Sequence, residues 1–168
     1  MTSASRRRVI VSNSSPLIHL ARIGRLELLK ILFNEIMIPY AVYYEVVIEG
    51  HRRPGAEEIA RAKWIRVMKI KDTKLKHALI LLLDEGEAET IVLALELNAS
   101  LVILDEREAR FIAKKMGLRV IGTLGILLRA KRLNLISSLR EELSKLKQTG
   151  FYIGDDVKRR ILKEASEI

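Results

Sequence analysis

The sequence predicts an α/β fold of three layers, α/β/α, in which a mainly parallel sheet lies between helices. Short apolar stretches that suit strands alternate with longer segments of helical periodicity along the chain. The clearest unit is residues 81–108, LLLDEGEAETIVLALELNASLVILDERE, which predicts a helix, a turn and a strand. Its apolar run at 101–104 is continuous, as expected for a strand covered on both faces.

The first predicted strand is residues 9–11, and a helix follows the polar stretch SNSSP. Ser14 or Ser15 is expected to cap that helix, with Pro16 at the first helical position, where a missing N–H costs nothing. Asn13 is therefore expected where the strand ends and the helix begins. This is the edge of an α/β sheet at which ligands usually bind.

The next segments continue the alternation. An amphipathic helix is predicted at 25–33, a strand at 35–38, and a helix that Pro39 opens and that carries Glu45. A loop at 51–55, a helix at 56–63 and a short strand at 64–70 follow. Residues 71–77 are polar and basic and form the least regular piece of the chain.

In the central unit, Gly86 is expected to open a helix that carries Glu87 and Glu89. Residues 87–97 would climb about 16 Å at about 1.5 Å each, and the strand that ends at Asp105 would return a similar distance. Glu87 and Asp105 are therefore expected near the same edge of the sheet. Two carboxylates placed together repel each other unless a cation or a proton lies between them.

The remainder of the chain predicts a helix at 106–116, a strand at 118–121 and a helix from Thr123 to Ile136. A helix at 138–148, capped by Ser137, and a terminal helix at 155–166 follow. We expect a single domain over residues 1–168, with a core at about 9–136 and a C-terminal helical extension at 137–168.

The composition indicates a globular protein, because 49% of the 168 residues are hydrophobic and 30% are charged. No apolar run is long enough to span a membrane. The chain has no cysteine, which excludes disulfides and thiolate metal sites and makes an intracellular, cytoplasmic location the default. The three histidines do not have the spacing of a metal site.

The net charge of +9, from 30 Lys and Arg against 21 Asp and Glu, favours a polyanionic partner such as nucleic acid. Many charged residues without cysteine are also typical of a heat-adapted surface. Composition leaves both explanations open.

Oxygen-bearing side chains fall at the predicted carboxyl edge of the sheet, and such ligands without His or Cys suit Mg²⁺ or Mn²⁺. Each acid alone also has an ordinary structural explanation, as a first-turn helix residue, a solvated helix position or an N-cap. Their common edge favours a site. The set is Asn13, Glu45, Glu87 and Asp105, with Glu89, Glu106 and Glu108 in reserve.

Four segments resemble the PIN-domain family, most closely its branch of small stand-alone archaeal and bacterial proteins. They are VIVSNSSPLIHLARIG, IPYAVYYEV, GEAETIVLALELNASLVILDERE and VIGTLGILLRAKRLNLI, and they span about residues 9–136. The resemblance implies a Rossmann-like sheet of about five strands, whose acidic cluster binds Mg²⁺ or Mn²⁺ to hydrolyse single-stranded RNA. Many members are toxins of toxin–antitoxin pairs, inhibited by a small partner, and many form homodimers.

The resemblance also implies a role for each residue of the set. Asn13 stands where the first metal-binding acid usually lies, and Ser15 corresponds to the small hydroxyl residue beside it. Matches to the other acids are Glu45, Glu87 and Asp105, with Glu106 or Glu108 for the last, variable acid. The expected catalytic residues are Glu45, Glu87 and Asp105, and the expected metal ligands are Asn13, Glu87, Asp105, Glu106 and Glu108.

Two functions are therefore expected. The first is a metal-dependent endoribonuclease of single strands, in which basic residues hold the RNA backbone. The alternative is a weakened or inactive module that binds RNA or a protein, because the amide of Asn13 brings no charge to the metal. A nucleotide-binding Rossmann domain is disfavoured because no GxGxxG follows the first strand. The RNA-binding candidates are Arg52, Arg53, Lys71, Lys74, Lys76, Arg107 and Arg110.

Overall fold

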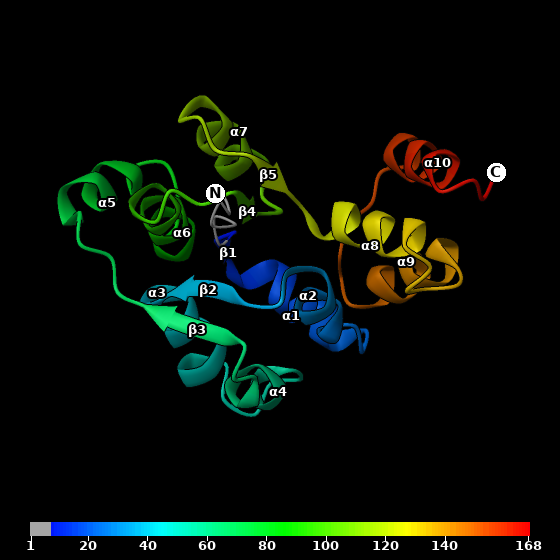
Figure 1. Cartoon of the computed structure of the whole chain (residues 1–168), viewed down its shortest axis with the longest axis horizontal. Helices are drawn as coiled ribbons and strands as arrows, with labels where there is room; N and C mark the ends of the chain where they lie inside the picture. The colour runs from blue at the N-terminus through cyan, green and yellow to red at the C-terminus, as the bar shows by residue number, and fades with distance from the viewer. Residues whose placement is uncertain (1–7) are drawn as a thin grey trace, which may run out of the picture.

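The computed structural model describes residues 8–168, in which a five-stranded sheet forms the centre of the fold (Figure 1). All neighbouring strands are parallel, in the order β3-β2-β1-β4-β5. This confirms the predicted α/β class and the mainly parallel sheet. The strands are β1 (Ile10–Ser12), β2 (Ile36–Pro39), β3 (Ile65–Met68), β4 (Leu101–Ile103) and β5 (Val120–Ile121).

Helices connect the strands and follow the last one. They are α1 (Ser14–Arg22), α2 (Glu27–Phe33), α3 (Tyr40–Tyr43), η1 (Tyr44–Glu49), α4 (Ala56–Arg61), α5 (Thr73–Leu79), α6 (Glu85–Glu96), α7 (Arg107–Lys115), α8 (Thr123–Arg132), α9 (Leu139–Gln148) and α10 (Asp155–Glu164). Within residues 8–168, no helix has the length and apolar character needed to cross a membrane.

Two hydrophobic clusters cover the two faces of the sheet and make the fold three-layered. Ile10 and Ile103 face the cluster that includes α1, α2, α8, α9 and α10. Val11 and Val102, one position away on the same strands, face the cluster formed with α5, α6 and α7. This alternation is the side-chain period of a strand, and burial on both sides explains the apolar sequences of β1 and β4.

Several boundaries differ from the predicted ones by one or two residues. Asn13 itself caps α1, rather than Ser14 or Ser15, and α6 begins at Glu85 behind the N-cap Asp84. Ser138, not Ser137, caps α9. The irregular basic piece at 71–77 contains the start of α5, whose N-cap Asp72 accepts a hydrogen bond from the Leu75 N–H.

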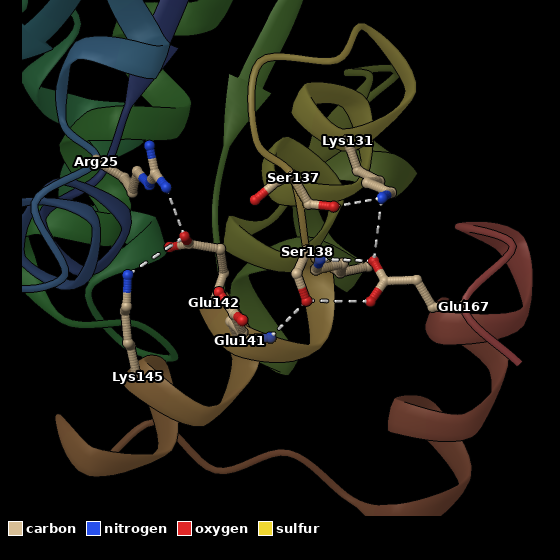
Figure 2. Close-up of polar contacts among 9 residues, drawn as sticks. Arg25, Lys131, Ser137, Ser138, Glu141, Glu142, Lys145 and Glu167 are labelled. Atoms are coloured by element: carbon tan, nitrogen blue, oxygen red, sulfur yellow. Dashed lines mark hydrogen bonds and ion pairs between the residues drawn. The ribbon is translucent and has the colours of Figure 1, made fainter.

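A buried carboxylate ties α9 to the body of the fold (Figure 2). Glu142 is 2% exposed, and its Oε1 accepts a 2.7 Å hydrogen bond from Arg25, in the turn between α1 and α2. Lys145 Nζ lies 3.5 Å from the same oxygen. Because a buried carboxylate without a cation is costly, this pairing fixes the position of α9.

The C-terminal segment caps the same helix from outside. Both carboxylate oxygens of Glu167 accept hydrogen bonds at the start of α9, from the N–H groups of Leu139 (2.5 Å) and Arg140 (3.0 Å). Lys131 Nζ lies 3.7 Å from Glu167 Oε2 (Figure 2). The helices after residue 136 thus pack on the core. The division into core and extension stays a prediction, and residues 1–7, which the predicted domain includes, lie outside the described residues.

Glu167→Gln should lower the free energy of unfolding at neutral pH by about 1 kcal/mol, as expected for the loss of a charged helix cap. Burial alone would raise the pKa of Glu167, but the Arg140 and Leu139 N–H groups and Lys131 together lower it. A carboxylate with a lowered pKa stabilises the fold fully above its ordinary value of 4.5. This stabilisation is lost as pH falls below that value and through the lowered pKa. The difference between the variant and the wild type should therefore shrink in acid.

Urea unfolding across this pH range measures the effect, with Glu49→Gln, which removes an exposed carboxylate from η1, as the matched control. Equal stability of Glu167→Gln and the wild type at neutral pH would contradict the capping role.

Candidate active site

The order of the strands opens the sheet at the carboxyl ends of β1 and β4. These neighbours are paired in parallel, and the helices that follow them, α1 and α7, pack on opposite faces of the sheet. The N–H of Asn13 continues the pairing by donating to the carbonyl of Ile103 at 3.0 Å. Ligands of parallel sheets bind at such points, where the connections from two neighbouring strands leave to opposite faces of the sheet.

Three side-chain oxygens converge at this edge, around Gly86 in the first turn of α6. A Cβ atom at residue 86 would lie 3.2 Å from Glu45 Oε2, 3.3 Å from Asn13 Oδ1 and 3.6 Å from Asp84 Oδ1. Glycine leaves this space open, whereas a larger residue would fill it. We call Asn13 Oδ1, Glu45 Oε2 and Asp84 Oδ1 the Gly86 oxygen cluster.

Asn13 contributes the most informative atom of the cluster. Its side chain is buried, with 4% exposure, and no donor within residues 8–168 binds its Oδ1. The great majority of buried polar atoms have a hydrogen-bond partner, so a buried oxygen without one leaves room for a water or a cation to bind.

Glu45 comes to the cluster from η1, a π-helical segment of the kind often found at functional sites. The hydroxyl of Ser14, the residue after Asn13, donates to Glu45 Oε2 at 2.6 Å. This short bond to a carboxylate orients Glu45 toward the end of β1. Ser14 therefore helps to build the site, although the sequence suggested only a capping role for it.

Asp84 and Glu87 bind each other's backbone at the start of α6. Asp84 Oδ1 accepts from the Glu87 N–H at 2.7 Å, and Glu87 Oε1 accepts from the Asp84 N–H at 3.0 Å. Burial raises the pKa of Glu87 to about 7, with the charges of Asp84 and Glu106 adding to it. A carboxyl group in this position takes up a proton or a cation near neutral pH.

Asp105 is held by a different set of donors. Its Oδ1 accepts from the Thr123 N–H at 2.7 Å, and its Oδ2 accepts from the hydroxyls of Thr123 (2.7 Å) and Ser15 (3.1 Å). Asp105 is therefore not the N-cap of α7, a position that Glu106 occupies, but joins β4 to the start of α8. These bonds fix the carboxylate and bring Ser15, at the start of α1, into contact with it.

The reserve acids separate into two kinds. Glu106 lies close enough to affect the pKa of Glu87, and Glu108 is exposed in the first turn of α7. Glu89 faces elsewhere, because its Oε1 accepts from the Ala41 N–H (3.0 Å) and its Oε2 from Lys76 (2.6 Å). Its role in the structure is to join α6 to α3 and α5.

The basic candidates also differ in position. Lys76 forms ion pairs with Glu85 (2.7 Å) and with Glu89, so carboxylates of the protein already neutralise its charge. Arg107 and Arg110 line a groove that includes Asp105. The remaining candidates lie on other segments and are exposed, and they are Arg52, Arg53, Lys71 and Lys74.

The predicted residues thus form neighbouring groups rather than one acidic cluster. Within residues 8–168, no group of three or more His, Cys, Asp or Glu side chains is placed to hold a metal. The amide of Asn13 completes a smaller set with two carboxylates. Sequence reasoning missed Asp84 and Thr123, although Asp84 with Glu87 three positions later is a capping-box pattern that marks the start of the helix.

The comparison with protein families agrees with this fold. A family model described as a PIN domain matches residues 9–167, almost the whole chain. The chain belongs to the PIN-domain family, which confirms the resemblance found in the sequence and gives it a nuclease-type fold. No curated protein matches the chain.

Glu87→Gln should stabilise the protein by about 1–3 kcal/mol at about pH 8 without divalent metal, because a pKa unit corresponds to about 1.4 kcal/mol. The pKa of about 7 in the fold lies above the ordinary 4.5, so the stability contributed by Glu87 falls as pH rises between these values. The amide still accepts the Asp84 N–H bond. The substitution therefore removes only the carboxylate charge of Glu87.

Thermal unfolding in EDTA at a series of pH values measures this effect, with the exposed Glu27→Gln as control. The two proteins should converge in stability as pH falls toward 4.5. A variant that is less stable than the wild type at every pH would show that the charge of Glu87 is not destabilising.

Proposed function

We propose that the chain is a Mg²⁺- or Mn²⁺-dependent endoribonuclease that cuts single-stranded RNA at the Gly86 oxygen cluster. The observation that carries the proposal is the buried, unpartnered Oδ1 of Asn13 beside two carboxylate oxygens at the open edge of the sheet. Membership of the PIN-domain family supports the nuclease class.

The donor set suits a hard cation. Mg²⁺ prefers oxygen ligands and is usually bound through one or two carboxylates, several waters and substrate phosphates. Asn13, Glu45 and Asp84 supply one amide and two carboxylate oxygens of this kind. A bound divalent ion would activate water and offset the charge that develops on a phosphodiester.

The surrounding residues would hold the site in shape. Ser14 orients Glu45, and Thr123 with Ser15 keeps Asp105 fixed at the same edge. Glu87 has a pKa near 7, which suits a group that takes or gives a proton at neutral pH. Catalytic roles for Glu45, Glu87 and Asp105, and metal contacts for Glu106 and Glu108, stay part of the proposal.

The alternative is a PIN module that binds RNA or a protein without cutting. Asn13 favours this alternative, because an amide in place of an acid lowers the charge that attracts the ion. A titration with Mn²⁺ separates the two functions. A toxin role, an antitoxin partner, a homodimer and a cytoplasmic location are supported by the family resemblance alone and stay predictions.

Asn13→Asp should tighten Mn²⁺ binding by about tenfold, or about 1.4 kcal/mol, because it adds a charge to the cluster without changing its shape. RNA cleavage in Mn²⁺ should rise with it. In EDTA the same variant should be less stable than the wild type, since a buried carboxylate then lies beside Glu45 and Asp84 without a cation. Isothermal titration calorimetry and a cleavage assay measure the two effects.

Asn98→Asp, a change at an exposed turn, is the matched control, and Glu45→Gln should weaken Mn²⁺ binding and cleavage together. Mn²⁺ binding that is the same in the wild type, Asn13→Asp and Glu45→Gln would place the metal elsewhere. Binding without cleavage in all three proteins would favour the non-cutting module.

A further inference from the structure

We propose that a single strand of RNA binds along the edge of the fold formed by β5 and α8, in a row of three grooves. The choice of RNA as the polymer rests on the proposed function, whereas the binding surface rests on the grooves and their charge. We call these grooves, in order from Asp105 to Arg8, the β5 groove row.

The three grooves are continuous. The first, of about 740 Å³, lies between β5, α8 and the segment 151–154 and includes Asp105. The second, of about 700 Å³, shares Val120, Ile121, Gly125 and Leu128 with the first. The third, of about 320 Å³, shares Leu101, Arg119 and Arg129 with the second. The row therefore runs past the edge strand β5 from the carboxyl end of the sheet to its amino end.

The charge along the row is almost entirely positive. Every charged residue that lines the second and third grooves is basic, and they are Arg8, Lys114, Arg119, Arg129 and Arg132. The first groove adds three arginines against Asp105 and Glu164. Glu164 lies 3.6 Å from Arg132, which leaves Asp105 as the acid at the end of the row. A polyanion is the partner that such a surface attracts.

The floor and the ends of the row favour a single strand over a duplex. Leu101, Leu118 and Leu128 line the second groove together with its basic side chains, so the groove offers apolar surface to unpaired bases and cations to phosphates. Tyr152, with 89% exposure, lies at the Asp105 end and offers a ring for stacking.

The first groove connects this surface to the candidate site. A Cβ atom at Gly122 would lie 2.9 Å from Arg110 Nη1 and 3.0 Å from Asp105 Oδ1, so a cation and an anchored acid flank the same glycine. Arg110 is itself held by a 2.8 Å bond to the carbonyl of Leu104. A strand in the row would thus end beside Asp105, next to the residues of the proposed nuclease site.

The test compares two triple variants that remove equal charge. The groove variant carries Lys114→Gln, Arg119→Gln and Arg129→Gln, and the control carries Lys30→Gln, Lys63→Gln and Lys147→Gln, all at exposed positions. Binding of labelled oligouridine is followed by fluorescence anisotropy in EDTA over a range of salt, so that cleavage plays no part. Circular dichroism and thermal unfolding verify that both variants fold.

The groove variant should bind RNA at least about tenfold more weakly. The slope of its log binding constant against log salt concentration should be smaller by about 2, since each phosphate contact to a single strand contributes about 0.7 to that slope. The control should match the wild type. Equal losses in both variants would show that only net charge matters. Displacement by polyglutamate as effective as by RNA, or equal binding of duplex RNA, would also overturn the proposal. Since Mn²⁺ is absent, these outcomes are independent of the metal titration.

Discussion

The parallel pairing of β1 with β4 is the constraint on which the rest of the structure depends. It places the ends of two strands, distant in sequence, at one edge, and the Asn13 N–H bond to Ile103 extends the pairing to the first residue of the site. Because α1 and α7 then leave to opposite faces, the edge between them stays open to side chains from η1 and α6. The fold thus creates the site before any ligand is considered.

The same pairing brings acidic side chains together, and their mutual repulsion is reduced differently at each position. Hydroxyl and N–H donors hold Asp105 at this edge, whereas Glu89 faces away from it and pairs with Lys76. Burial and neighbouring charges raise the pKa of Glu87 instead. The amide of Asn13 avoids a further charge at a buried position, which favours stability of the metal-free fold at the expense of attraction for a cation.

The sequence was sufficient for features that depend on local pattern. The continuous apolar runs predicted β1 and β4, and the helical period with Asn98 at the turn predicted α6, because burial on both faces and a left-handed turn leave clear signals. Features that depend on contacts between distant segments were not predictable in this way. The bond from Thr123 to Asp105 and the pairing of Lys76 with two acids are tertiary contacts, which no local period records.

Intermediate cases had a local signal that competed with another. The basic side chains of residues 71–77 hid a helix whose buried face consists mainly of Leu79, with Leu75 packed beside it. At α6, Gly86 suggested the helix start, although the capping box of Asp84 and Glu87 decides it. That box also placed Asp84 in the Gly86 oxygen cluster, so the missed cap was also a missed site residue.

The position of Mn²⁺ in crystals of the protein, located from anomalous difference maps, tests the Gly86 oxygen cluster most directly. We expect a peak beside Gly86, in contact with the side-chain oxygen of Asn13 and with Glu45 or Asp84. A peak bound to other residues only, or the Asn13 amide turned so that its nitrogen faces the two carboxylates, would contradict it.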